Sequence, residues 1–294
     1  MTQISIEHDS HYQYQTEVEL AHHLAYLRPM EFNGQRVVSS KLDITPTPDR
    51  LTENTDTFGN RRSFFTLSIP HDTLMVRATS VVTLVDRYAK FNIQDASDWE
   101  DVRDALEYAL NRPYVAQCEF TFPSPYVPRL SVLREYAMAS FPRGRGLAQA
   151  CIDLSARIHR DFTYSPAATE VNTPLHEAFE KRAGVCQDFS HILIGCLRSI
   201  GLSAKYVSGY LLTKPAPGQE KLRGADASHA WVAVYCPEAP DGWLELDPTN
   251  NVIPQLGHVR LAMGRDFGDV SPLRGVIRGG DDHVLKVGVT VEQI

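Results

Sequence analysis

Alternation of apolar and polar residues predicts strands with one buried face, and it runs through the first 86 residues of the chain. The alternating positions include Tyr12, Tyr14, Val18, Leu20, His22, Leu24 and Tyr26, and the pattern continues at 37–44, 64–69 and 74–85. Asp56–Asn60 is a turn signal, because Gly59 and Asn60 readily take a positive φ. Several short strands separated by turns predict a β-sandwich-like N-terminal module over residues 1–90.

The apolar spacing becomes helical after Arg87. Ser97 and Glu100 match a capping box, which predicts a helix from there to about Leu110. This helix and a proline-containing crossing segment take up residues 91–125. Further helices are predicted at 130–141, 146–162, 175–182 and 186–200, and further strands at 204–212, 228–235, 243–247 and 284–291. Helices followed by strands predict an α+β core over 126–294, with one helix packed on an antiparallel sheet.

The most informative stretch is Gly184–His191, at the start of the helix predicted over 186–200. Cys186 is expected in the first helical turn, where free backbone N–H groups and the helix dipole stabilise a thiolate. Gly184 has no Cβ, so it is expected to leave the approach to this turn open. Asp188 is expected to cap the helix start. A single cysteine is more often an inert core residue than a nucleophile, so further residues have to decide.

Two later segments supply those residues. His229 begins the strand predicted at 228–235, and Asp247 ends the strand predicted at 243–247, where Pro248 stops it. Adjacent antiparallel strands would place His229 beside Asp247. A cysteine, a histidine and a carboxylate in this relation form the nucleophile, base and orienting group of cysteine acyl-transfer enzymes.

Four sequence blocks resemble the transglutaminase-like superfamily in its bacterial form, strongly over about 125–270 and more weakly in the β-rich N-terminal region. They are Arg182–Phe189, Tyr206–Tyr210, Asp226–Val232 and Trp243–Asn250. The resemblance implies a papain-like core with a catalytic triad. In this sequence the nucleophile is then Cys186, the general base His229 and the orienting acid Asp247.

The expected reaction is acyl transfer from a peptide or isopeptide amide through an acyl-enzyme. Resemblance to bacterial members with a β-rich N-terminal module favours a cysteine peptidase or amidase, in other words a cysteine protease-like hydrolase. Protein-glutamine transamidation and a non-catalytic peptide-binding scaffold remain alternatives. The N-terminal module is open to three interpretations: a substrate-docking surface, a stabilising cap, or a dimer interface that would make the protein a homo-oligomer.

Four further residues are candidates for substrate or oxyanion contacts. The backbone N–H of Cys186 is expected to be one oxyanion donor, and Gln187, Tyr164 or another backbone amide is a candidate for the second. Trp231 is expected either to line the site or, more in keeping with a large aromatic residue in a strand, to pack in the core. Arg265 is expected either to bind a substrate carboxylate or to form a structural ion pair with Asp266 or Asp269.

The composition of the chain argues against several classes of binding partner. The net charge of −7 over 294 residues argues against a nucleic-acid surface, and no apolar run is long enough to cross a membrane. No secretory signal is recognisable, and five dispersed cysteines suit free thiols, so a cytoplasmic location is expected. Cys186, His229 and Asp247 are metal-ligand types, but no paired-ligand spacing or calcium loop supports a metal site. We therefore expect no cofactor and no metal.

Overall fold

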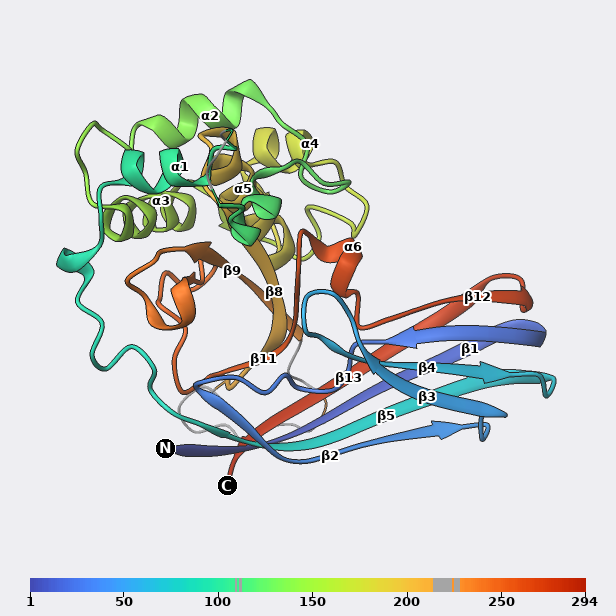
Figure 1. Cartoon of the computed structure of the whole chain (residues 1–294). Helices are drawn as coiled ribbons and strands as arrows, with labels where there is room; N and C mark the ends of the chain where they lie inside the picture. Colours follow the sequence, from blue (N-terminus) through green and yellow to red (C-terminus); the bar gives the residue numbers. More distant parts are fainter. Residues whose placement is uncertain (109, 111–112, 214–223, 225–227) are drawn as a thin grey trace, which may run out of the picture.

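The computed structural model describes residues 1–108, 110, 113–213, 224 and 228–294 (Figure 1). The larger sheet contains β1 (Thr2–Ala25), β2 (Gln35–Thr45), β3 (Arg50–Thr55), β4 (Arg61–Leu67), β5 (His71–Leu84), β12 (Leu273–Gly279) and β13 (His283–Gln293). The smaller sheet contains β8 (Ala204–Leu211), β9 (Ser228–Tyr235), β10 (Trp243–Leu246) and β11 (His258–Gly264). The helices are α1 (Trp99–Leu106), α2 (Ser131–Met138), α3 (Leu147–Asp161), α4 (Leu175–Lys181), α5 (Cys186–Ser199) and α6 (Phe267–Val270). The α+β class is as predicted.

The larger sheet is built around β1, which is 24 residues long. Its first half pairs with β5 on one edge and β13 on the other, and its second half pairs with β4 and β12. The predicted β-rich N-terminal module is confirmed, but its strands form one antiparallel sheet rather than two facing ones. The alternation along β1 fixed which residues share a face. The alternation did not show which strands pair with each edge of β1. Those pairings decide whether the strands form one sheet or two.

The C-terminal strands β12 and β13 belong to this sheet. The sequence placed the terminal strand with the core range 126–294, whereas β13 pairs with β1 from Ile4↔Gln293 to Tyr14↔His283. The two ends of the chain therefore lie side by side (Figure 1). A pairing between residues so far apart in the sequence leaves no local signal.

The predicted core helices are present, with ends shifted by a few residues. The capping box at Ser97 is wrong: α1 begins at Trp99, its N-cap is Asp98, and the Ser97 side chain bonds to Glu238 instead. α1 also ends at Leu106, earlier than predicted. No helix among the described residues has the length and apolarity to span a bilayer.

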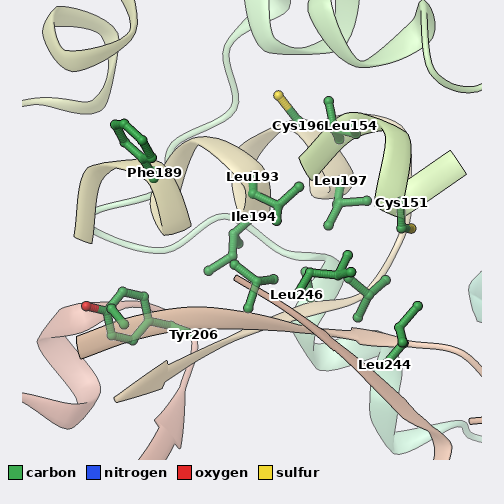
Figure 2. Close-up of a cluster of buried hydrophobic side chains, with 14 of the residues drawn as sticks. Cys151, Leu154, Phe189, Leu193, Ile194, Cys196, Leu197, Tyr206, Leu244 and Leu246 are labelled. Carbon is green, nitrogen blue, oxygen red and sulfur yellow. The ribbon is translucent and has the colours of Figure 1, made fainter. Parts of the chain in front are cut away.

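α5 packs across the smaller sheet, whose strand order is β10-β9-β8-β11. Leu193, Ile194 and Leu197 on the helix are completely buried (Figure 2). They belong to one buried cluster with Tyr206 of β8 and Leu246 of β10. Burying one such aliphatic side chain contributes about 1.5–3 kcal/mol. This contact therefore fixes α5, and with it the residue at its N-terminus, against the strands that carry the other site residues.

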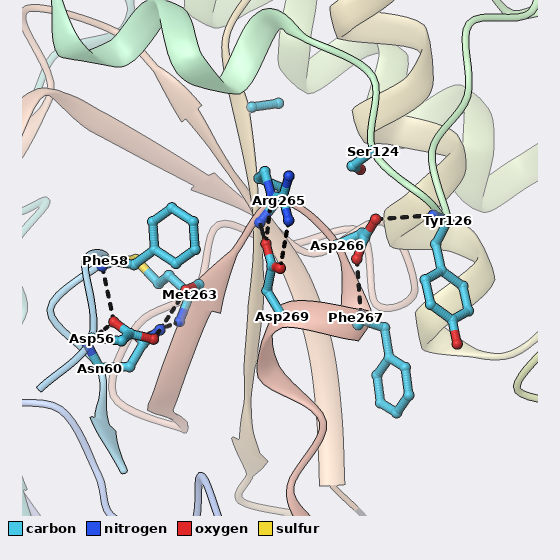
Figure 3. Close-up of polar contacts among 12 residues, drawn as sticks. Asp56, Phe58, Asn60, Ser124, Tyr126, Met263, Arg265, Asp266, Phe267 and Asp269 are labelled. Atoms are coloured by element: carbon cyan, nitrogen blue, oxygen red, sulfur yellow. Dashed lines mark hydrogen bonds and ion pairs between the residues drawn. The ribbon is translucent and has the colours of Figure 1, made fainter. Parts of the chain in front are cut away.

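The outer edge of β11 is joined to the larger sheet by two side-chain amides. Gln35 exchanges two hydrogen bonds with the backbone of Arg260, both 2.8 Å long. Asn60 does the same with the backbone of Met263, with two bonds of 2.7 Å (Figure 3). Asp56 accepts a further bond from the Asn60 amide at 2.9 Å. Each amide offers the donor and acceptor that a neighbouring strand would offer, so the larger sheet is held in place beside the core.

Candidate active site

Cys186 is the first residue of α5, as the sequence predicted. The helix start is capped by Asp188, whose carboxylate accepts the backbone N–H of Val185 at 2.8 Å and the hydroxyl of Thr169 at 2.6 Å. The predicted capping role of Asp188 is confirmed. The absence of a Cβ at Gly184 lets the Asp188 side chain come close, because a Cβ there would lie 2.4 Å from the Asp188 carboxylate. Glycine is needed to make room for the cap.

His229 and Asp247 come from the adjacent antiparallel strands β9 and β10, and Asp247 follows the last residue of β10. The Nε2 of His229 lies 2.7 Å from Oδ2 of Asp247. Cys186 and His229 line the same cavity, and the charge of the Cys186 sulfur acts on the imidazole. Because Nε2 is engaged by the carboxylate, Nδ1 is the ring nitrogen left for the sulfur. The structure thus brings the three predicted residues together in one row.

The surroundings of His229 and Asp247 favour the charged form of each side chain. Burial lowers the pKa of His229, but the hydrogen bonds and negative charges of Asp247 and Cys186 outweigh burial and raise that pKa to about 10. Burial also opposes ionisation of Asp247, yet its bonds to His229 and His258 hold the pKa of this carboxyl well below its usual range. At neutral pH the row therefore contains a carboxylate and an imidazolium, and an imidazolium stabilises a neighbouring thiolate.

The carboxylate of Asp247 accepts five hydrogen bonds, and the residue is completely buried. Its Oδ1 accepts the backbone N–H of Thr249 at 2.9 Å and that of Asn250 at 3.1 Å. Its Oδ2 accepts His229, the Asn250 side-chain amide at 2.7 Å and Nε2 of His258 at 3.0 Å. The sequence reasoning missed Asn250 and His258. The Asp-Pro-Thr-Asn run is a turn signal that pointed to Asn250. His258 begins β11, and nothing local links it to Asp247.

Comparison with known proteins shows the family of this chain. Residues 4–83 match the bacterial transglutaminase-like N-terminal region, and residues 145–248 match the transglutaminase-like superfamily. The chain belongs to the transglutaminase-like superfamily. An uncharacterized protein from Mycobacterium tuberculosis is 36% identical over 291 residues, covering 97% of this chain and 91% of the relative.

Two further proteins are similar over different extents. A protein-glutamine gamma-glutamyltransferase from Pseudomonas aeruginosa is 35% identical over 101 residues, which cover 33% of this chain and 15% of that enzyme. The crystal structure of a protein from Cytophaga hutchinsonii, described as a candidate cysteine protease, superposes with a TM-score of 0.76. It covers 100% of this chain and 91% of its own, at 19% identity, and so shows a shared fold.

A cavity of about 450 Å³ opens beside Cys186 in this transglutaminase-like chain. Its walls come from both parts of the molecule. The core contributes Val171, Val185, Gln187, Tyr206, Ser208, Ser228, Ala230 and Phe267 next to Cys186 and His229. The larger sheet and its connection contribute His8, Ser10, Tyr12, Ser271, Pro272, Leu273, Leu285 and Val287. A substrate-docking surface was one of the three interpretations of the N-terminal module, and the strands of the larger sheet do line this cavity.

The two side chains named as candidates for a second oxyanion donor differ in their surroundings. Gln187 lines the cavity, but its side-chain N–H donates to the carbonyl of Val171 at 2.9 Å. Tyr164 is about half exposed, and its pKa is raised by burial and by the negative charge at Cys186. Tyr164 thus lies within electrostatic reach of the sulfur, whereas the Gln187 amide is already engaged.

Trp231 and Arg265 lie outside the cavity wall. Trp231 is completely buried, and its ring packs 6.0 Å from that of His229 and 5.2 Å from that of His258, measured between centroids. Its place is therefore in the core, behind the imidazoles. Arg265 forms a two-pronged ion pair with Asp269, with both distances 2.9 Å (Figure 3). This is the structural ion pair that the sequence analysis gave as one alternative, and Arg265 does not line the cavity.

One group of potential metal ligands is present among the described residues. Nitrogen and oxygen atoms of His229, Asp247 and His258 lie within 4.8 Å of one another. Both histidines already contact the same Asp247 oxygen, at 2.7 and 3.0 Å. A metal bound by these atoms would break the bond between His229 and Asp247. The arrangement is accounted for by hydrogen bonds that orient His229.

Proposed function

We propose that this protein is a thiol-dependent acyl-transfer enzyme that hydrolyses peptide or isopeptide amides. Cys186 acts as the nucleophile, His229 as the proton carrier and Asp247 as the group that orients the imidazole. The observation that carries the proposal is the 2.7 Å hydrogen bond between His229 and Asp247, with His229 and Cys186 lining the same cavity at the start of α5.

The chemistry follows from the charges of these side chains. The thiolate of Cys186 attacks the amide carbon, and the carbonyl π electrons move to oxygen. The first-turn N–H groups of α5 have no acceptor within the helix and are placed to stabilise this oxyanion. His229 gives its Nδ1 proton to the leaving nitrogen as the C–N bond breaks. Water then attacks the thioester, returns a proton to His229, and releases the acid and the thiolate.

Two features support hydrolysis over transamidation. The Cys186 side chain is partly exposed, so water can reach an acyl group held there. The described residues that line the cavity include no aspartate or glutamate, so they offer no counter-ion for the ammonium group of a lysine acceptor. The similarity to a protein-glutamine gamma-glutamyltransferase keeps transamidation as the second candidate.

The test is a library of glutamine-containing and other peptide amides, incubated with and without a primary amine and analysed by mass spectrometry. We expect acid products from the wild type in both conditions and none from Cys186→Ala. Cys118→Ala is the matched control, since Cys118 is also a free, partly exposed thiol and does not line the cavity. Product that forms only with the amine would establish a transamidase. Equal hydrolysis by Cys186→Ala and wild type would reject the proposal that Cys186 is the nucleophile of an enzyme.

A further inference from the structure

The wall of the cavity opposite the core is a strip of one sheet face. Ser10 and Tyr12 on β1 and Leu285 and Val287 on β13 all line the cavity. Ser10 pairs directly with Val287, and Tyr12 with Leu285. Directly paired residues of antiparallel strands project to the same side. We call these four residues the sheet wall; in Figure 1, β1 and β13 run side by side below the core.

The next residue of the same strand gives an internal comparison. Val284 pairs with Gln13, so it projects to the opposite face of the sheet. It does not line the cavity, although it is 59% exposed and Leu285 is 44% exposed. Two similar apolar side chains, one residue apart, thus differ mainly in which face of β13 they occupy.

The polar groups beside the sheet wall carry no charge. His8 lies next along the same face of β1, and its ring contacts the hydroxyl of Tyr210 at 2.8 Å and that of Ser10 at 3.1 Å. Burial lowers the pKa of His8 to about 4, against the opposing effect of Asp9. His8 is therefore neutral at pH 7. No lysine, arginine, aspartate or glutamate occurs among the described residues that line the cavity.

Leu285 and Val287 leave apolar surface uncovered in the cavity, which an apolar group of a ligand could cover. Val287 is 50% exposed, so both side chains present apolar surface inside the cavity that contains Cys186. Apolar surface is covered favourably by apolar groups. A charged group placed against Leu285 and Val287 would lose water without gaining a counter-ion from the sheet wall.

We propose that the sheet wall binds an uncharged, apolar or aromatic group of the substrate next to the reacting amide. The N-terminal module and the last strand of the chain then form part of the substrate site. This inference rests on the proposed chemistry of Cys186, because the cavity is a substrate site only if that sulfur reacts.

The test uses N-substituted iodoacetamides as probes, which alkylate a thiol and need no turnover. Iodoacetamide itself is the reference, N-benzyl iodoacetamide carries an apolar arm, and N-carboxymethyl iodoacetamide carries an anionic one. Such an arm can turn to either side of the sulfur. The rate of labelling at Cys186 is measured by peptide mass spectrometry and divided by the rate with free cysteine. The variants are Leu285→Glu, Val287→Glu and the opposite-face control Val284→Glu, each checked by thermal unfolding.

In the wild type we expect the benzyl probe to label Cys186 about tenfold faster than iodoacetamide, and the anionic probe more slowly than iodoacetamide. Leu285→Glu and Val287→Glu should reduce the ratio of the benzyl labelling rate to the iodoacetamide labelling rate to about one. Val284→Glu should behave as wild type. The inference fails if the wild type shows no benzyl advantage, or if Val284→Glu and Leu285→Glu have equal effects.

Failure of the proposed function has a different signature. In that case wild type and Cys186→Ala would both leave every peptide amide intact, whatever the alkylation rates show. If amides are hydrolysed but the probes do not distinguish the two faces of β13, the enzyme stands and the role of the sheet wall is rejected.

Discussion

Replacement of His258 by phenylalanine would remove one of the five donors to Asp247 and keep a ring against Trp231. His258 donates to Oδ2 of Asp247 at 3.0 Å, beside the bond that the same oxygen forms with His229. Its ring also packs edge-on against Trp231, at 5.2 Å between centroids. His258 does not line the cavity, so it acts as a positioning residue.

The expected magnitude follows from the remaining bonds. A hydrogen bond to a charged group contributes about 1.5–3 kcal/mol. Asp247 would keep four donors in His258→Phe, so we expect the lower end of that range to be lost. A loss of about 1.4 kcal/mol corresponds to a tenfold lower kcat. KM should stay within about twofold, because no contact in the cavity changes. His258→Gln offers a new side-chain N–H and should stay within about threefold of the wild-type kcat.

The assay is steady-state hydrolysis of a peptide amide identified by the library, with thermal unfolding of each variant as the control for folding. A purely structural role would lower the melting temperature of His258→Phe and leave kcat per folded molecule unchanged. Wild-type kcat in folded His258→Phe would refute the reasoning, as would equal losses of kcat in the phenylalanine and glutamine variants.

Three further predictions concern the same row and its surroundings. Asp247→Asn should lower kcat on the order of 10³- to 10⁴-fold, because the imidazole loses its orienting charge; turnover near the wild-type rate would contradict this. The pKa of His229 is raised to about 10, so its contribution to stability should be fully present below about pH 6.5 and be lost as the pH rises through 10. Urea unfolding of wild type and His229→Gln at pH 6, 8 and 10 should therefore show a shrinking difference, and a constant difference would count against the ion pair. Arg265→Ala should cost less than about 1 kcal/mol in urea unfolding and leave turnover unchanged, because its pair with Asp269 is partly exposed and lies outside the cavity.

Several features of the fold and the site could be predicted from short stretches of sequence. The helical spacing before residue 200 located α5, and the special role of Cys186 followed from its place at the helix start. The cap by Asp188 acts over three residues and was readable for the same reason. The hairpin of β9 and β10 was predictable because a short turn joins two apolar strands. In each case the physical cause lies within a few residues of the feature.

Other features depend on residues that are remote in the sequence. His258 reaches Asp247 only because β11 pairs with β8 at the edge of the smaller sheet. The order of the strands in the smaller sheet therefore determines that His258 is the fifth donor to the carboxylate. Similarly, Ser97 matched a capping box, but a bond to Glu238 from a distant loop took its place. Local preference is overridden when a tertiary partner offers a better bond.

The sequence by itself determined the α+β core, the position of Cys186 at a helix start, and the strands that carry His229 and Asp247. These rest on periodicity, capping and turns, which act between near neighbours. Only the tertiary structure decided that β13 returns to pair with β1, and that this pair forms one wall of the cavity beside Cys186. The pairing of the two chain ends is set by how all the apolar faces are covered at once, and no short stretch of sequence encodes that.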